Sequence, residues 1–234
     1  MGKQYTLLTP SLQEFIEKQK LFIVASAPLY GQYINASPKG HSSYGKVVDP
    51  THFIYLEMNG SGNETISHVR ETGRMSVMFM SFIGAPLILR IYGRGIVHLN
   101  GSKKFDEYCE KHYSDVMADF PYRSIIELEI SFVTTSCGFA VPTYEYIEDR
   151  QTLINYNIKL SDAALDVKKR EWNTVSLDGL PGLPEFDSTL ASIFQFYTTM
   201  RYRLSPPFYD TLLLATGFAA GICTLAIVGG KALV

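Results

Sequence analysis

The sequence predicts a mainly β protein with peripheral helices, in which an antiparallel barrel is followed by a C-terminal transmembrane helix. Six short apolar or alternating runs, separated by turn residues, predict the strands of an antiparallel meander. Closing these strands into a full or nearly full barrel removes exposed strand edges, which favours that arrangement. An uncharged stretch over residues 211–230 predicts the membrane helix.

Local signals place each element along the chain. Ser11 and Glu14 match an S-x-x-E capping box, which predicts the start of the first helix. Tyr30-Gly31 and Gly84-Ala85-Pro86 predict turns between strand pairs. The expected elements are a helix over 11–20, strands over 21–27, 32–37 and 52–58, a helix over 64–72, strands over 75–82 and 87–99, a helix over 103–112, and a strand over 125–134.

Composition limits the possible partners. Twenty-one basic and 23 acidic residues give a net charge of −2, and no Lys/Arg run of the kind that follows a nucleic-acid backbone is present. We therefore expect no nucleic-acid partner. The three cysteines, Cys109, Cys137 and Cys223, are widely spaced, which indicates a reducing compartment and predicts no metal site.

The two ends of the chain carry different membrane signals. Gly2 to Thr6 matches the M-G-x-x-x-[ST] pattern that permits myristoylation at Gly2. The twenty uncharged residues of 211–230 span about 30 Å as a helix, enough to cross a bilayer. Arg201 and Arg203 precede this span, which favours a tail anchor with a cytosolic N-terminal domain. A hydrophobic hairpin or a core helix is the alternative interpretation.

These signals divide the chain into a barrel domain over residues 1–185, a juxtamembrane segment over 186–210 and the anchor over 211–230. Many glycines and alanines make the span only moderately apolar. The outer mitochondrial membrane is the expected location, with the endoplasmic reticulum and peroxisome as alternatives.

The glycine-rich turn over residues 59–65 is the strongest binding signal. It follows a predicted strand and begins a helix, whose unpaired amides and partial positive charge suit a phosphate group. Gly60 and Gly62 allow close approach of the backbone, while Ser61, Asn63 and Thr65 add side-chain donors. A capping box of Ser61 with Glu64 would satisfy the same amides without a ligand, so both interpretations stay open.

Five motifs in fixed order resemble the pyridoxamine 5′-phosphate oxidase-like family, the FMN-binding split barrels. They are Phe22-Ile-Val-Ala-Ser-Ala-Pro28, Ile34-Asn-Ala-Ser-Pro-Lys-Gly40, Gly60-Ser-Gly-Asn-Glu-Thr65, Gly73-Arg-Met-Ser-Val-Met-Phe79 and Leu89-Arg-Ile-Tyr-Gly-Arg-Gly95. Two later motifs, Ser136-Cys-Gly-Phe-Ala-Val-Pro142 and Ser176-Leu-Asp-Gly-Leu-Pro-Gly-Leu-Pro184, resemble a fungal-type subgroup. The resemblance covers residues 5–185.

The resemblance implies a six-stranded split barrel that forms a homodimer and holds FMN between the two subunits. The residues that it implies for cofactor binding are Ser37, Lys39, Ser61, Gly62, Asn63, Thr65 and Arg90. A cation such as Lys39 favours a phosphate over a simple helix cap, because a dianion gains from a charge-assisted contact. The alternative for Arg90 is an inward ion pair with Glu57.

Departures from the family pattern bear on the activity. Ile88 stands where pyridoxamine-phosphate oxidases carry a flavin-contacting glutamine, and Arg203-Leu204-Ser205 lacks the histidine of their phosphate-gripping Arg-x-His. The resemblance therefore implies an FMN-dependent oxidoreductase of unknown substrate, with catalytic residues unknown. A flavin-binding or flavin-free dimeric scaffold is the alternative function, and haem or a deazaflavin is the alternative cofactor.

Overall fold

The computed structural model describes residues 2–116 and 122–183, which form eight strands and five helices. The strands are β1 (Lys3–Tyr5), β2 (Leu21–Ser26), β3 (Asn35–Gly40), β4 (Gly45–Asp49), β5 (His52–Met58), β6 (Arg74–Met80), β7 (Leu87–Leu99) and β8 (Tyr122–Cys137). The helices are α1 (Pro10–Lys18), α2 (Glu64–Thr72), α3 (Lys103–His112), α4 (Thr152–Ile158) and α5 (Asp162–Trp172).

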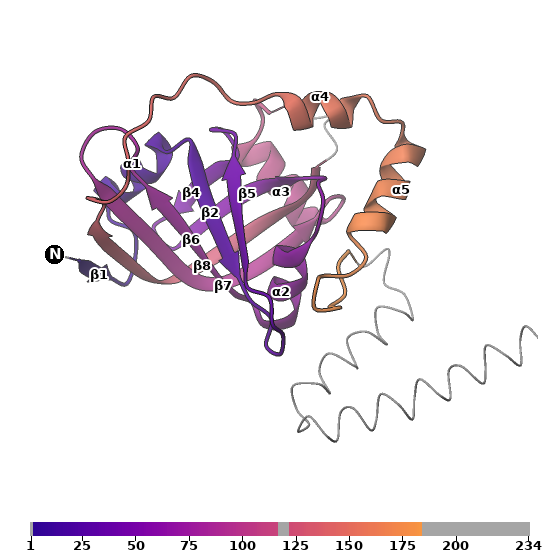
Figure 1. Ribbon diagram of the computed structural model, residues 1–234, viewed down its shortest axis with the longest axis horizontal. Coiled ribbons are helices and arrows are strands. Elements are labelled where there is room, and N and C mark those ends of the chain that lie inside the picture. The colour runs from indigo at the N-terminus through magenta and orange to yellow at the C-terminus, as the bar shows by residue number, and fades with distance from the viewer. Residues whose placement is uncertain (1, 117–121, 184–234) are drawn as a thin grey trace, which may run out of the picture.

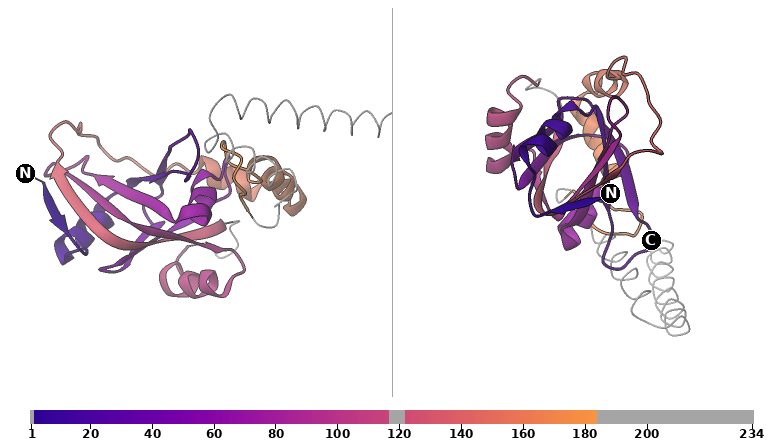
Figure 2. Two further views of the ribbon diagram at one scale, coloured as in Figure 1. Left: turned by 90° about the horizontal axis from the view of Figure 1, so that it is seen from below. Right: turned by 90° about the vertical axis from the view of Figure 1, so that its left-hand side faces the viewer.

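All strands belong to one curled antiparallel sheet (Figure 1). The strand order is β3-β2-β6-β7-β8-β5-β4, and β1 pairs with β8 outside this path. Because β3 and β4 end the order, the described strands form a curled half-barrel, whereas a closed or nearly closed ring was expected. Figure 2 shows the sheet wrapping around its core, with α4 and α5 beyond one end.

Strand β5 and the first half of β8 are buried on both faces. Inside the curl, Phe22, Phe53 and Phe79 pack edge to face or tilted, with ring centroids 5.4 to 5.7 Å apart. On the outer face, Ile54 of β5 packs in a second cluster with Phe105 and other residues of α3. Five consecutive residues of β5 are therefore buried, where a one-sided strand would alternate.

Most predicted elements are confirmed, and the exceptions have physical causes. All six predicted strands and the three predicted helices are present, although β3 runs over Asn35–Gly40 where 32–37 was predicted, and β1, β4, α4 and α5 were not predicted. The capping box at Ser11 is wrong, because α1 begins at Pro10 with Thr9 as its N-cap. Glu14 instead pairs with Lys18 at 2.6 Å along the helix surface.

The membrane prediction falls outside the residues that the structure describes. Within the described ranges, no helix has the length and apolar character that a bilayer crossing requires. Residues 186–210 and 211–230 both lie beyond Leu183, where the description ends.

The pairing of β7 with β8 depends on Gly93. A Cβ atom at this position would lie 1.8 Å from the carbonyl oxygen of Glu129, beside the register shift between Tyr92 and Gly93. Gly93→Ala should lower the free energy of unfolding by about 2 kcal/mol or more, because the backbone of a central strand must move. Gly40→Ala is the matched control, since nothing lies within 4 Å of its added Cβ. Equal denaturation midpoints for the two variants would contradict this account of the sheet.

Candidate functional site

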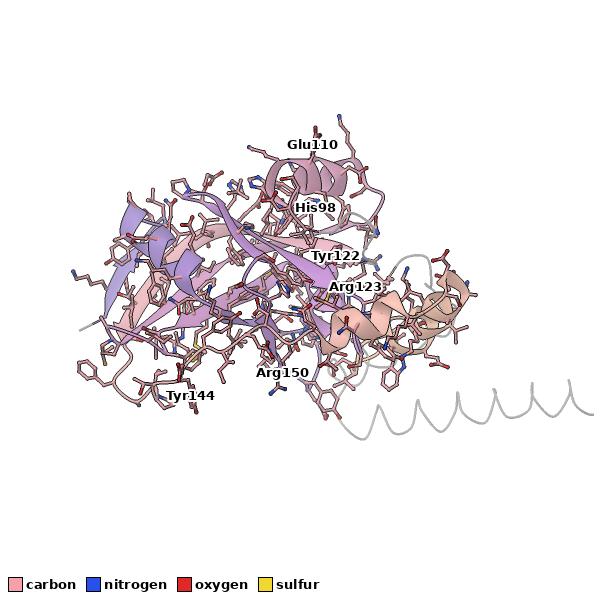
Figure 3. The ribbon with its side chains drawn as sticks, turned by 90° about the horizontal axis from the view of Figure 1, so that it is seen from above. His98, Glu110, Tyr122, Arg123, Tyr144 and Arg150 are labelled. Carbon is pink, nitrogen blue, oxygen red and sulfur yellow. The ribbon has the colours of Figure 1, made fainter. Side chains whose placement is uncertain are left out.

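A cavity of about 1100 Å³ opens beside the ends of β3 and β5. Its wall combines Ser37 and Lys39 of β3 with Ser61 of the glycine-rich turn. The end of α1, the turn between β6 and β7, and residues of the irregular segment 138–151 also line the cavity. Tyr144 and Arg150 of that segment lie along one side of the molecule, whereas Arg123 lies further in (Figure 3). The cavity thus joins segments that are far apart in the sequence.

A buried ionic cluster forms the base of this cavity. The carboxylate of Glu57, 3% exposed, accepts hydrogen bonds from Lys39 Nζ at 3.0 Å and from Arg123 Nε at 3.2 Å. Ser124 Oγ donates a third bond at 3.1 Å. Burial alone would raise the pKa of the Glu57 carboxyl, but Arg123 and Lys39 together lower that pKa to about 2. Two cations therefore face one carboxylate, which leaves a net charge of +1 in the cluster.

A β-bulge places Arg123 in this cluster. Glu57 pairs with Ser124 and Met58 pairs with Tyr122, so Arg123 is the extra residue on β8. Bulges of this kind redirect a side chain that the regular pleat would place elsewhere. Sequence reasoning missed Arg123, although a lone cation at the start of a strongly apolar strand was a signal for it.

Only the first part of the glycine-rich turn lines the cavity, and the rest is bonded to the protein. Ser61 is exposed and lines the cavity, as does Gly60. Gly62 has a φ of +77° and accepts a hydrogen bond from Arg123 Nη1 at 2.8 Å through its carbonyl oxygen. The turn is thereby fixed to the ionic cluster. Gly62 adopts a left-handed backbone conformation, which glycine reaches without strain.

Asn63 and Thr65 do not line the cavity. Asn63 is buried, and its Nδ2 donates to Ser67 Oγ at 3.2 Å and to the carbonyl oxygen of Asn173 at 3.1 Å. Thr65 Oγ1 accepts from Asn35 Nδ2 at 3.0 Å. Both side chains therefore already have protein partners, and their direct contact with a cofactor stays a prediction.

The alternative capping box of Ser61 with Glu64 is absent. Asn63 is the N-cap of α2, with no side-chain capping bond, and the Glu64 carboxylate accepts from the amide of Leu177 at 3.1 Å. This contact belongs to the C-terminal loop, residues 173–183, which covers the start of α2. A Cβ on Gly182 would lie 1.7 Å from Asn63 Nδ2, so the close fit of this loop requires glycine there.

Arg90 lies away from the cavity lining on β7. Its Nη1 donates to Ser136 Oγ at 3.3 Å. The alternative ion pair of Arg90 with Glu57 is wrong, because Glu57 is held by Lys39, Arg123 and Ser124.

Two histidines, His41 and His68, lie in different surroundings. His41 lines the cavity with a φ of +74° and stacks on Tyr44 at a centroid distance of 4.3 Å. His68 is fully buried, and its Nδ1 lies 3.0 Å from Ser26 Oγ.

Comparison with known proteins identifies relatives of the described domain. The family model described as pyridoxamine 5′-phosphate oxidase matches residues 8–137. The pyridoxamine 5′-phosphate oxidase family protein ustO of Aspergillus flavus is 36% identical over 196 residues, which are 76% of this chain and 77% of that protein.

Solved structures are similar to this chain at lower identity. HupZ of Group A Streptococcus is 21% identical, with a TM-score of 0.42, and the match covers 53% of this chain and 89% of that chain. An FMN-binding protein from Syntrophomonas wolfei is 14% identical, with a TM-score of 0.39, and the match covers 52% of this chain and 80% of that chain.

The Glu57 cluster makes the stability depend on pH in a defined direction. Because the folded pKa of about 2 lies below the ordinary value of 4.5, the contribution of the carboxylate is complete above pH 4.5 and is lost as the pH falls through 2. Glu57→Gln should lower the free energy of unfolding by about 3 kcal/mol near neutral pH, since Arg123 is left without its counter-charge. Denaturation curves between pH 2 and 7 should show this difference shrinking towards acid.

Glu14→Gln provides the matched control for this measurement. Glu14 pairs with Lys18 on the exposed surface of α1, so its replacement should leave the curves nearly unchanged. A difference between wild type and Glu57→Gln that stays constant over the whole pH range would show that the carboxylate charge is not what stabilises the cluster.

Proposed function

The chain belongs to the pyridoxamine 5′-phosphate oxidase family, and from this premise we propose that it is an FMN-binding flavoprotein whose cofactor phosphate lies against the Glu57 cluster. The observation that carries the proposal is the surplus cation of that cluster, at the base of the cavity and beside the exposed Ser61. A phosphate dianion gains most where a cation and free polar groups are held in place before binding.

The residues present fit such a group. The cavity volume of about 1100 Å³ is sufficient for a mononucleotide-sized ligand together with a smaller molecule. Lys39 is partly exposed while bonded to Glu57, so its ammonium keeps donors for a second acceptor. Arg123 is held by Glu57 and by Gly62, which fixes the cationic wall in one geometry.

Each predicted site residue has a defined place in this proposal. Lys39, Ser61 and Ser37 are proposed to contact the phosphate directly, with Arg123 supplying the second positive charge. Gly62, Asn63 and Thr65 are proposed to shape the turn from behind. For Arg90, contact with the flavin remains a prediction without support from the cavity lining.

When bound, FMN supplies hydride and electron transfer, and the protein supplies position and surroundings. The family relationship supports an oxidoreductase of unknown substrate. We do not propose a vitamin B6 phosphate as that substrate, because Ile88 replaces the family glutamine and no Arg-x-His follows. Residues of segment 138–151 line one side of the cavity, where Tyr144 packs on Phe82 with ring centroids 5.4 Å apart.

We also propose that the protein is a homodimer tethered to a membrane by residues 211–230, with the described domain in the cytosol. The dimer is supported by the family resemblance. The tether is supported by twenty uncharged residues with two arginines before them. The outer mitochondrial membrane remains the proposed location.

Lys39→Gln should weaken FMN binding by roughly 10- to 100-fold, because a charge-assisted contact with the phosphate is lost. Affinity is measured by titrating the purified full-length protein in detergent and following flavin fluorescence. Lys18→Gln is the matched control, since Lys18 lines the same cavity but pairs with Glu14 on the exposed surface of α1, outside the Glu57 cluster. Equal affinities for the two variants, with both proteins folded, would remove the Lys39 cluster from the binding site.

Tight FMN binding without turnover of NADH or NADPH would favour the scaffold over the oxidoreductase.

The tether gives a separate prediction. Full-length protein expressed in cells should stay with membranes after alkaline carbonate extraction, whereas a chain ending at residue 210 should be released, because the apolar span supplies the insertion free energy. Release of both chains would contradict the anchor without affecting the flavin proposal.

A further inference from the structure

The loop over residues 27–34, which joins β2 to β3, is apolar and points outward. Its sequence, APLYGQYI, contains no charged residue. Ile34 is 80% exposed, and the side chains of Leu29 and Tyr33 are each about half exposed. Large apolar side chains gathered at a loop tip are unusual on a soluble surface and indicate a contact with another apolar phase.

Three backbone amides of this loop are bonded to carboxylates of the protein. The amide of Leu29 donates to the Glu71 carboxylate at 2.8 Å, and the amide of Gln32 donates to Asp178 at 2.9 Å. The amide of Tyr33 donates to the other oxygen of Asp178 at 3.4 Å. A Cβ on Gly31 would lie 2.7 Å from the Asp178 side chain, so the loop fits closely against this buried carboxylate. Amides bonded in this way do not need water, which is the condition for entering an apolar phase.

A second segment extends the same apolar surface. Leu177, 72% exposed, precedes Asp178 in the C-terminal loop, and so lies beside the residues that Asp178 holds. We call Leu29, Tyr33, Ile34 and Leu177 the apical patch. The 27–34 loop and the C-terminal loop both lie at the α2 end of the molecule (Figure 1).

The chain leaves the described domain at this end. The amide of Leu183 donates to the carbonyl oxygen of Asn173 at 3.0 Å, so the exit point is fixed to the C-terminal loop. The 27 residues of 184–210 separate it from the uncharged span. Even fully extended, 27 residues reach at most about 95 Å, so the exit point lies no farther than that from the anchor. The proposed anchor therefore confines the apical patch to the neighbourhood of the bilayer, which raises its effective concentration there.

We propose that the apical patch inserts into the interfacial layer of the bilayer beside the anchor and thereby fixes the orientation of the domain. This inference rests on the proposed tether. A convex, uncharged tip carrying tyrosine matches the interface, where an aromatic ring can bury its apolar body and keep its hydroxyl hydrated. The opening of the flavin cavity then keeps one orientation relative to the membrane, which favours a substrate that arrives along the membrane surface.

The test uses the full-length chain reconstituted in phosphatidylcholine and phosphatidylethanolamine vesicles. Cys109, Cys137 and Cys223 are replaced by serine, and an environment-sensitive NBD fluorophore is attached to the new thiol of Ile34→Cys. Nitroxide-labelled lipids should quench the probe at position 34 by about twofold or more, because interfacial residues lie within reach of the label. Phe139→Cys is the matched control, since Phe139 is 83% exposed and follows β8 near the end that pairs with β1.

Three outcomes separate the proposals. Quenching at position 34 but not at 139, reduced by Leu177→Glu, supports insertion of the apical patch. If the protein floats with the vesicles while position 34 is unquenched, insertion is wrong but the tether is still supported. Disulfide crosslinking between two unlabelled Ile34→Cys chains would then identify a second copy of this chain as the partner of the patch. Protein that does not float with the vesicles overturns both the insertion and the tether.

Discussion

The site depends on one buried carboxylate, that of Glu57. A carboxylate removed from water is costly unless it is paired and hydrogen-bonded, and here β3 supplies Lys39 while β8 supplies Arg123 and Ser124. The cluster ties the edge strand β3 to the pair β5 and β8, although β3 and β5 are not neighbours in the sheet. The curl of the half-barrel is therefore fixed at the place where the cavity opens, and the same bonds that hold the fold also position the cations.

The surroundings of this cluster are built in layers. The outer face of β5 and β8 is covered by α3, while the inner face packs on the aromatic core. The C-terminal loop closes the remaining side, where Asn173 donates to the carbonyl oxygens of Gly60 and Gly62. The glycine-rich turn is thus held by Arg123 from one side and by Asn173 from the other. Its conformation is set before any ligand arrives, which reduces the entropy cost of binding.

Local patterns in the sequence predicted the elements better than the contacts between them. Strands with clear alternation or apolar runs, such as β5 and β7, were predicted with the observed bounds, because periodicity reports burial directly. The short strand β4 is half-buried at every position and gives no alternation to detect. Arg123 depends on a bulge, and Asn63 depends on a partner 110 residues away, so neither role is encoded in a local window. The family resemblance identified Lys39 and Ser61, which the cavity brings together, but it could not show that Asn63 and Thr65 already have protein partners.

The position of the cations changes the physical basis of the proposed anion site. A helix N-terminus offers about half an elementary charge, and only where its amides remain accessible. At the start of α2 the C-terminal loop covers this position, and Glu64 turns its carboxylate to the amide of Leu177. The nearby cluster offers a full surplus charge at the base of an open cavity, with the hydroxyl of Ser61 on the same wall. The proposed recognition of a phosphate is therefore better attributed to the cations that Glu57 holds in place than to the helix dipole. In this proposal the glycine-rich turn serves mainly to bring its exposed residues beside those cations.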